Sequence, residues 1–297
     1  MKENYRSGFV AIIGRPNVGK STLMNAMIGE KIAIISDKPQ TTRNRIQCVL
    51  TRPDYQLIFL DTSGIHKPKN KLGEYMVQTA RSSLEEVDAV LFVVDVAEGV
   101  GAGDKFILES LKDLDTPVIL VANKVDRASK AKVDEELDAF TAMGRFSDVI
   151  RVSALNGTNI PELEKLIVSY MPEGPQYYPD DMITDQPERV IIAELIREKA
   201  LELLKDEVPH GIGVEVMKME ERSGKDLLDI HATIYCEKKS HKAIVIGKGG
   251  KMLKEIGQRA RQDIEKLLGT HVYMELWIKV KEDWRNNSSM LKTLGYE

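Results

Sequence analysis

The sequence predicts an α/β fold with a mainly parallel sheet, followed by a smaller α+β domain. Strand-length apolar runs alternate with helical patterns from Phe9 to about Met171, as in a parallel sheet covered by helices on both faces. The stretch from Met171 to Pro187 carries four prolines, which suits an extended connection. Beyond it the order of apolar runs changes. We therefore expect two domains joined by a linker.

Composition restricts the class of protein. The 297 residues are 42% hydrophobic and 30% charged, enough for about two domains with a substantial core. The N-terminus has no charged-then-apolar leader, and the longest apolar strings are short, as at Val90–Val96, so neither a signal peptide nor a membrane span is indicated. Cys48 and Cys236 lie far apart in strand-like runs, which suits a reducing cytoplasm. Five scattered histidines and the lack of a cysteine cluster argue against a structural metal site.

The first loop has the pattern of a phosphate-binding loop. Residues 14–21, GRPNVGKS, follow a strand expected over Phe9–Ile13 and lead into a helix expected over Leu23–Ile28. This strand, loop and helix order is the context that the motif requires. The residues predicted to contact the nucleotide here are Gly14, Arg15, Pro16, Asn17, Val18, Gly19, Lys20, Ser21 and Thr22.

The residue types of this loop indicate separate roles. Gly14 and Gly19 let the backbone curl so that its N–H groups point at phosphate oxygens, and the following helix adds its positive end. Lys20 is expected to reach the β and γ phosphates, and the Ser21 hydroxyl is expected to ligate Mg²⁺.

A second motif indicates which base is bound. The sequence NKVD, residues 123–126, follows a strand expected over Pro117–Ala122, so its polar side chains fall at the carboxyl end of a strand, where open α/β sheets bind ligands. The Asp126 carboxylate can accept hydrogen bonds from both N1–H and the 2-amino group of guanine, whereas adenine would leave it unpaired. We therefore predict GTP and GDP as ligands, and not ATP.

Four more residues are predicted to complete this base pocket. Asn123 and Lys124 are expected to brace the base and the phosphate loop. Ser153 and Ala154 follow a strand expected over Val149–Val152 and are expected to close the pocket around the base.

Two intervening loops are predicted to sense the γ-phosphate. Asp61 follows a strand expected over Gln56–Leu60, so it is placed to hold Mg²⁺ through water, while the Gly64 N–H contacts the γ-phosphate. The stretch Pro39–Arg43 precedes another strand, and Thr42 is expected to close over Mg²⁺ when the γ-phosphate is present. In the loop that begins at Asp61, the predicted nucleotide contacts are Asp61, Thr62, Ser63 and Gly64. The predicted catalytic residues are Lys20, Thr42 and Gly64.

One absence bears on the rate of hydrolysis. Many switch GTPases carry a Gln just after the Asp-x-x-Gly motif to orient the attacking water, but this chain has Ile65. We therefore expect slow intrinsic hydrolysis, with the water placed by backbone or by another group. His66 is an alternative, although a histidine in a polar loop more often faces solvent.

The C-terminal part predicts a different domain. The expected elements are a helix, two strands, a short helix, a longer helix over Lys251–Leu268 and a strand over Val272–Val280. A Gly-x-x-Gly sequence, Gly247–Gly250, lies between the two adjacent helices. This order of elements, with the glycine loop at this position, resembles a type-II KH domain.

The chemistry around this loop suits single-stranded RNA. Gly247 and Gly250 would let a nucleic-acid backbone pass close, and Val245–Ile246 would form an apolar groove for unstacked bases. The whole chain has a net charge of −4, but residues 238–266 carry nine basic and three acidic residues, a net charge of +6. The predicted RNA contacts are Ile246, Gly247, Lys248, Gly249, Gly250 and Lys251.

Together these motifs make the chain resemble the bacterial Era GTPase family over nearly its whole length. The motifs GRPNVGKS, PQTTR, DTSG, NKVD, SAL and IGKGG occur in that order. Ser63 stands where the family usually has Pro, which leaves the switch kinetics open. The division predicted is a P-loop GTPase domain at 1–171, a linker at 172–188, a KH domain at 189–282 and a tail at 283–297.

The resemblance implies a role in assembly of the small ribosomal subunit. It implies that the KH groove binds the 3′ end of 16S rRNA on the 30S subunit, with GTP favouring binding and GDP favouring release, and that no DNA is bound. It also implies that an apolar residue at Ile65 is normal, and that members with Asn at the position of Asn17 use K⁺ to assist hydrolysis. Some members are found at the inner face of the cell membrane, although the tail 283–297 is too short and mixed to argue for membrane contact.

Two alternatives stay open at this point. The first is a constitutive RNA-binding assembly factor whose nucleotide is mostly structural. The second is a signalling GTPase whose basic segment binds protein or anionic lipid instead of RNA. Both would retain the GTP motifs.

Overall fold

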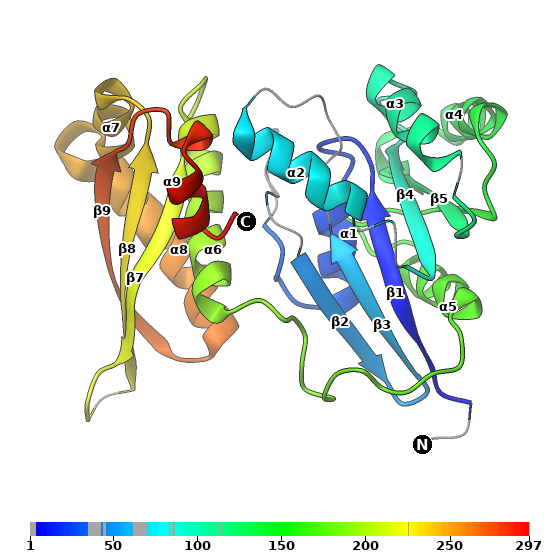
Figure 1. Cartoon of the computed structure of the whole chain (residues 1–297), viewed down its shortest axis with the longest axis horizontal. Coiled ribbons are helices and arrows are strands. Elements are labelled where there is room, and N and C mark those ends of the chain that lie inside the picture. The colour runs from blue at the N-terminus through cyan, green and yellow to red at the C-terminus, as the bar shows by residue number, and fades with distance from the viewer. Residues whose placement is uncertain are drawn as a thin grey trace. The chain divides into compact units, whose positions relative to one another are not determined.

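The computed structural model covers the whole chain and describes residues 4–34, 43, 46–61, 70–82, 84, 87–112, 114–224 and 226–296. The chain divides into two compact units, with the main division between Asp185 and Gln186 (Figure 1). No helix in these described parts is both long and apolar enough to cross a membrane.

The first unit is built on a six-stranded sheet with the strand order β2-β3-β1-β4-β5-β6. All neighbouring pairs are parallel except β2 and β3. The prediction of a mainly parallel sheet is confirmed, with one antiparallel edge strand. The elements are β1 (Arg6–Ile13), α1 (Lys20–Ile28), β2 (Ile46–Arg52), β3 (Tyr55–Asp61), α2 (Lys71–Ser82), β4 (Ala89–Asp95), α3 (Ala102–Leu111), β5 (Val118–Asn123), η1 (Val125–Arg127), α4 (Lys130–Met143), β6 (Asp148–Arg151) and α5 (Ile160–Tyr170).

The antiparallel pair has a local cause. Only Pro53 and Asp54 separate β2 from β3, and a two-residue connection can join only antiparallel strands, because a parallel crossover needs a dozen residues or more. The connections from β3 to β4, from β4 to β5 and from β5 to β6 each pass through a helix, which returns the chain to the same end of the sheet.

The strands of this sheet are apolar on both faces because helices cover both. β4 is buried along its whole length. One face carries Phe92 and packs on α3 and α4, where Phe140 meets Phe92 edge-on with ring centroids 6.2 Å apart. α1 and α5 contact each other away from this cluster (Figure 1). This arrangement leaves the carboxyl ends of the parallel strands for the loops that carry the nucleotide motifs.

The proline-containing stretch after α5 lies along β2 and β3 rather than standing away from the unit. The side chain of Gln56, which is fully buried, accepts hydrogen bonds from the backbone N–H groups of Tyr177 and Tyr178, at 2.8 and 3.0 Å. Further along, the Val49 N–H donates to the Ile183 carbonyl at 2.9 Å. This part of the predicted linker is therefore fixed to the edge of the sheet as far as Asp185.

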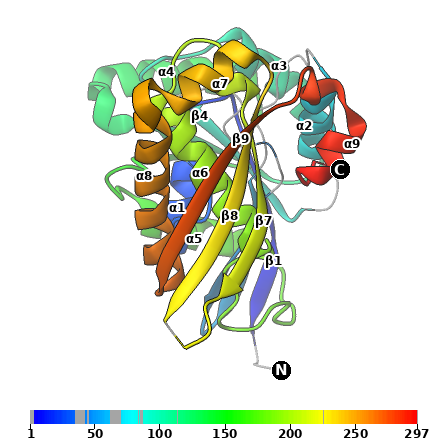
Figure 2. The ribbon, with the colours of Figure 1, turned by 90° about the vertical axis from the view of Figure 1, so that its left-hand side faces the viewer.

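The second unit has a three-stranded sheet with the order β7-β8-β9, in which β7 and β8 are antiparallel and β8 and β9 are parallel. Figure 2 shows this sheet with α6 and α8 packed on one of its faces. The prediction of a KH order of elements is confirmed. The elements are α6 (Glu188–Leu203), η2 (Pro209–Gly211), β7 (Gly213–Glu221), β8 (Leu227–Cys236), α7 (Lys239–Ile246), η3 (Lys248–Gly250), α8 (Lys251–Leu268), β9 (His271–Val280), η4 (Trp284–Asn286) and α9 (Ser288–Thr293).

The segment expected to be a tail packs into the second unit. Trp284 is fully buried, and its indole N–H donates to the Gly211 carbonyl at 2.9 Å. Arg285 forms an ion pair with Glu237 at 2.6 Å. A buried tryptophan with a satisfied N–H adds to the core of a small domain, so this segment is part of its fold.

Candidate functional site

The phosphate-binding loop connects β1 to α1 at the carboxyl end of the sheet. Gly19 has φ of 100°, in the left-handed region, and a Cβ there would lie 2.4 Å from the Asn123 side-chain nitrogen. Both the conformation and the close approach require glycine. α1 begins at Lys20, so the N–H groups of its first turn lack acceptors within the helix and can bind an anion.

Lys20 is buried within this loop. Its Nζ donates to the carbonyl oxygens of Gly14 and Arg15, at 3.0 and 2.8 Å. Burial lowers the pKa of Lys20 to about 8, although the Asp61 carboxylate acts in the opposite direction. An ammonium group desolvated in this way gains strongly from an arriving phosphate, which agrees with the role predicted for Lys20.

The base-recognition motif reaches the phosphate loop from the end of β5. The Asn123 side chain donates to the Val18 carbonyl at 2.9 Å, and Lys124 Nζ donates to the Asn17 carbonyl at 2.6 Å. The predicted bracing of the phosphate loop is therefore present. Lys124 also forms an ion pair at 2.6 Å with Asp95, a fully buried residue that ends β4.

Asp95 was not predicted as part of the site, although its position was visible in the sequence. It ends an apolar strand, as Asp61 does, but no known motif marks it. Its other carboxylate oxygen accepts from the Ala97 N–H at 2.9 Å, which fixes the loop after β4.

The predicted base pocket lies at the end of β5 and just after β6. Asp126 is exposed, and the Ser153 hydroxyl donates to its carboxylate at 2.5 Å. The Ala154 N–H donates to the Asn123 side-chain oxygen at 3.0 Å. Four residues predicted from separate motifs thus meet at one edge of the sheet, and their contact with guanine stays a prediction.

Two of the predicted magnesium ligands are adjacent. The Ser21 hydroxyl donates to the Asp61 carboxylate at 2.8 Å, and Asp61 is fully buried at the end of β3. The other residues predicted for this side of the site lie outside the described residues: Thr42, Thr62, Ser63 and Gly64, together with Ile65 and His66.

In the second unit, the predicted Gly-x-x-Gly loop joins α7 to α8. Gly247, Gly249 and Gly250 all have positive φ, at 71°, 60° and 77°. A Cβ on Gly250 would meet nothing within 4 Å, so the space beside it is open. Lys248 and Lys251 are exposed at this loop, in positions that agree with the predicted phosphate contacts.

The apolar part of the groove differs from the prediction. Val245 is fully buried in the core of the second unit, so the prediction that it lines the groove is wrong, while Ile246 is only partly buried. A helix has only one groove-facing side, and Val245 points from α7 into the core. A hollow of about 530 Å³ instead lies between α8 and β9, lined by Gly250, Leu253, Lys254, Gly257, Gln258, Arg261, Val272, Tyr273, Met274 and Leu276.

The sequence contained a signal for this face of α8. Gly250, Lys254, Gln258 and Arg261 recur every three or four residues, the period of one helical face. A basic helix face beside a glycine loop is therefore a better guide to this groove than the apolar residues before the loop.

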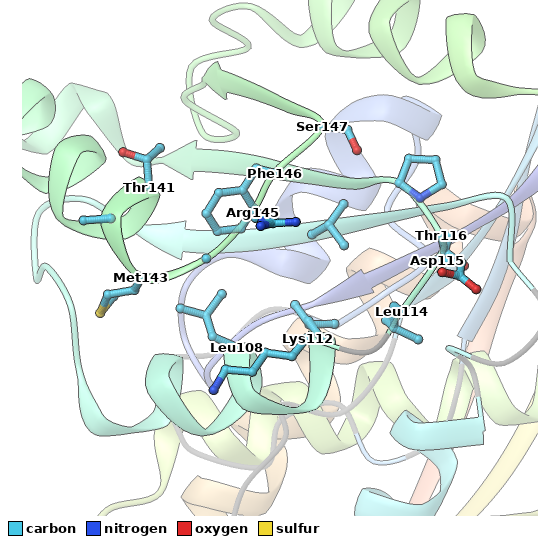
Figure 3. Close-up of a pocket in the computed structure, with 15 residues that line it drawn as sticks. Leu108, Lys112, Leu114, Asp115, Thr116, Thr141, Met143, Arg145, Phe146 and Ser147 are labelled. Atoms are coloured by element: carbon cyan, nitrogen blue, oxygen red, sulfur yellow. The ribbon is translucent and has the colours of Figure 1, made fainter.

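A second hollow lies in the first unit, far from the predicted nucleotide contacts. It has a volume of about 790 Å³ and opens at the amino ends of β5 and β6. Figure 3 shows Leu108 of α3 and Lys112, just after α3, facing Met143, Arg145 and Phe146, which lie at and beyond the end of α4. Parallel sheets bind ligands at the opposite end of their strands, so we assign it no part in nucleotide binding.

Each of the two units matches a known protein family. Residues 9–124 match the family described as 50S ribosome-binding GTPase, and residues 207–285 match the KH domain family. The two matches together place the phosphate loop, the NKVD motif up to Lys124, and the glycine loop within recognised families.

Comparison with whole proteins covers the chain from end to end. GTPase Era of Alkaliphilus oremlandii is 62% identical over 293 residues, 99% of each chain, and GTPase Era of Clostridioides difficile is 55% identical over 98% of this chain and 99% of its own.

Two solved structures match equally completely. An Era variant of Aquifex aeolicus bound to GDP and AlF₄⁻ has a TM-score of 0.94 at 43% identity, covering 98% of this chain and 99% of its own. An Era complex with MgGDPNP and nucleotides 1506–1542 of 16S ribosomal RNA has a TM-score of 0.95 at 44% identity, with the same coverage. These matches cover both units, and the chain belongs to the Era family of GTPases.

Proposed function

We propose that this GTPase binds 16S rRNA near its 3′ end during assembly of the small ribosomal subunit, and that its nucleotide state controls its affinity for RNA. The observation that carries the proposal is the presence of a guanine-nucleotide motif set and a basic KH groove in one chain. The Era relative in complex with MgGDPNP and a 16S rRNA fragment supports both ligands.

The residues present fit a magnesium ion bound with the nucleotide. Ser21 and Asp61 supply a hydroxyl and a carboxylate oxygen 2.8 Å apart, and Mg²⁺ prefers oxygen ligands completed by substrate phosphates. Ser21 would hold the ion directly, Asp61 would hold it through water, and Thr42 would join when the γ-phosphate is present. The ion would neutralise phosphate charge, while Lys20 and the Gly64 N–H would bind the β and γ phosphates.

For RNA, the proposal uses the glycine loop and the face of α8. Lys248, Lys251, Lys254 and Arg261 supply positive charge along one side of the groove. Leu253 and Leu276 supply apolar surface against which unstacked bases can lie. Single-stranded RNA fits this combination, because a duplex would not expose its bases to the groove.

The linker contacts support a route by which nucleotide state could reach the KH domain. The loop that carries Thr42 leads into β2, and β2 is hydrogen-bonded to the linker through Gln47 and Val49. A change in that loop would therefore act on a strand to which the linker is fixed. By linkage, RNA should then tighten GTP binding as much as GTP tightens RNA binding.

The direct test measures binding of the full chain to an oligonucleotide that matches the 3′ end of 16S rRNA. We expect tight binding with a non-hydrolysable GTP analogue, weaker binding with GDP, and weak binding to a scrambled RNA or to DNA of the same sequence. Equal affinity in both nucleotide states would instead indicate a constitutive RNA-binding factor. No RNA binding in either state would contradict the proposal.

The choice of ribosomal partner and location needs separate measurements. We propose the 30S subunit and the cytoplasm, with peripheral association at the inner membrane, so co-sedimentation should be compared for purified 30S subunits, 50S subunits and vesicles containing anionic lipid.

Asn17 has a positive φ of 68° in the phosphate loop, and we propose that K⁺ assists hydrolysis there. Hydrolysis at equal ionic strength in KCl and NaCl tests this, and equal rates would contradict it.

A further inference from the structure

The side chain of Arg15, the second residue of the phosphate loop, lies in a slot at the start of α3. Its Nε is 2.8 Å from the Asp104 carboxylate, and its Nη2 donates to the Gly99 carbonyl at 3.0 Å. Two glycines make room for it. A Cβ on Gly101 would lie 2.5 Å from Arg15 Nη1, and one on Gly103 would lie 2.9 Å from Cγ and Cδ. The slot is therefore shaped to this side chain.

The slot itself is fixed from two directions. Asp104 accepts from the Gly101 N–H at 2.8 Å, which caps α3. From α4, Glu136 accepts from the Val100 N–H at 3.2 Å and Lys132 donates to the Ala97 carbonyl at 2.5 Å. Arg15 is thus anchored to a loop that cannot shift without breaking contacts to a second helix.

The anchor acts on a residue that shapes the nucleotide site. The Arg15 carbonyl accepts from Lys20 Nζ at 2.8 Å, so displacing Arg15 would also displace the acceptor of the lysine predicted to reach the phosphates. Two residues on, the Asn17 carbonyl is held by Lys124, which is paired with Asp95. The phosphate loop is therefore held at Arg15 and at Asn17, and both contacts lead to the segment from Asp95 to Asp104.

The Arg15–Asp104 ion pair lies largely out of solvent. Asp104 is fully buried and the Arg15 side chain is 20% exposed, so little solvent screens the charges. Burial raises the pKa of Asp104, and Arg15 opposes that effect. Removing the arginine alone would leave a buried carboxylate uncompensated, which is a cost to folding as well as to the loop.

We propose that Arg15 and Asp104 are positioning residues that hold the phosphate-binding loop in the shape that accepts GTP and GDP. Arg15 was predicted to belong to the nucleotide site, and the structure gives its side chain this separate role. A loop already held in its binding shape loses less conformational freedom when the nucleotide arrives, and so binds it more tightly. The inference rests on the GTPase activity and not on RNA binding, so failure of the proposed RNA switch would leave it unaffected.

The first test is Arg15→Met in the full chain, measured by release of GDP that carries a fluorescent methylanthraniloyl group. Loss of this charged anchor should speed GDP release by about tenfold and lower the affinity for a GTP analogue by a similar factor. Preference for guanine over xanthine nucleotides should not change, because Asp126 is untouched. The control is Arg151→Met, which removes a solvent-exposed arginine that pairs with Asp134 at 2.6 Å.

A second variant separates loop positioning from general stability. In Arg15→Met with Asp104→Asn the buried charge is gone, while the asparagine oxygen can still accept from the Gly101 N–H. The double variant should therefore recover melting temperature relative to Arg15→Met and keep fast GDP release. Release that returns to the wild-type rate together with the melting temperature would overturn the proposal.

Gly103→Ala gives an independent test, because it leaves both charges in place. Alanine in α3 favours the helix, but its Cβ would occupy the space of the Arg15 stem. We expect faster GDP release, with a melting temperature no lower than that of Arg15→Met. The proposal would be overturned if Gly103→Ala and Arg15→Met both fold and both release GDP within about twofold of the wild-type rate, which is well under the expected effect.

Discussion

The nucleotide site and the KH groove differ in how much the protein has fixed before a ligand arrives. In the nucleotide site, side chains already bond to groups of distant motifs: the Asn123 amide donates to the Val18 carbonyl, and the Ser153 hydroxyl donates to the Asp126 carboxylate. The KH loop is instead closed by backbone hydrogen bonds, from the N–H of Gly247 to Ala243 and from that of Gly250 to Gly247. Open space surrounds Gly250.

This difference matches what each site is proposed to recognise. A guanine nucleotide is one rigid molecule with a fixed pattern of donors, so a preformed pocket can discriminate strongly. An RNA strand is flexible and is bound through backbone phosphates and stacked bases, so an open groove with exposed lysines suffices. Substitutions should therefore have large, selective effects at the first site and smaller, graded effects at the second.

The largest expected effect is at the base pocket. Asp126→Asn should abolish the preference for GTP over XTP, a change of about 10⁴-fold, because the substituted amide can no longer accept both guanine donors. Affinities for the two nucleotides measured by titration would show this. Asp134→Asn, an exposed aspartate on α4, is the control, and a retained preference for GTP in Asp126→Asn would refute the assignment of base recognition.

At the glycine loop the expected effect is smaller. Gly250→Asp should weaken RNA binding by at least about tenfold, because it adds a negative charge where a phosphate would pass and strains a residue with φ of 77°. Affinity for GDP should stay unchanged in the absence of RNA. Gly269→Asp is the matched control, since Gly269 also has positive φ and open space but lies at the other end of α8. Loss of both RNA and nucleotide binding would contradict separate sites.

A graded effect is expected along α8. Arg261→Ala should weaken RNA binding by a few-fold and lower the slope of log K against log salt by about 1, as for loss of one phosphate contact. Arg259→Ala is the control on the same helix, because Arg259 is paired with Glu255 at 2.7 Å and does not line the groove. Equal effects of the two substitutions would show that the groove has no specific path for the phosphates.

The last prediction concerns thiol alkylation, which we expect to be slow at both cysteines, one in each unit. Burial raises the pKa of Cys48 and of Cys236 above their ordinary value of 9.0, so the thiolate is scarce at pH 8. Above pH 9.0 the unfolded chain loses these thiol protons while the folded chain keeps them. The two cysteines therefore lower the free energy of unfolding as the pH rises above 9.0. Alkylation at pH 8 should be slow for both thiols until denaturant is added. Rapid labelling of Cys48 alone would show that the linker edge of β2 opens in the native state.

The sequence predicted the elements better than their surroundings. The strand and helix pattern predicted α8 over Lys251–Leu268 with the bounds observed, because its apolar residues repeat at helical spacing. β1 begins at Arg6, three residues before the predicted start, because its first residues pair with β3 although they are less apolar. The helix of the expected tail, α9, went unpredicted, since it is only six residues long and Leu291 is its one buried residue.

By itself the sequence determined the two domain types and the residues of the nucleotide motifs, because local spacing of glycine, lysine and aspartate on known elements specifies that chemistry. Tertiary structure alone decided three further features. Val245 entered the core rather than the groove, Gln56 became the anchor of the linker, and Arg15 turned toward Asp104. Each depends on which face of an element meets a segment far away in the chain, and periodicity within one element does not carry that information.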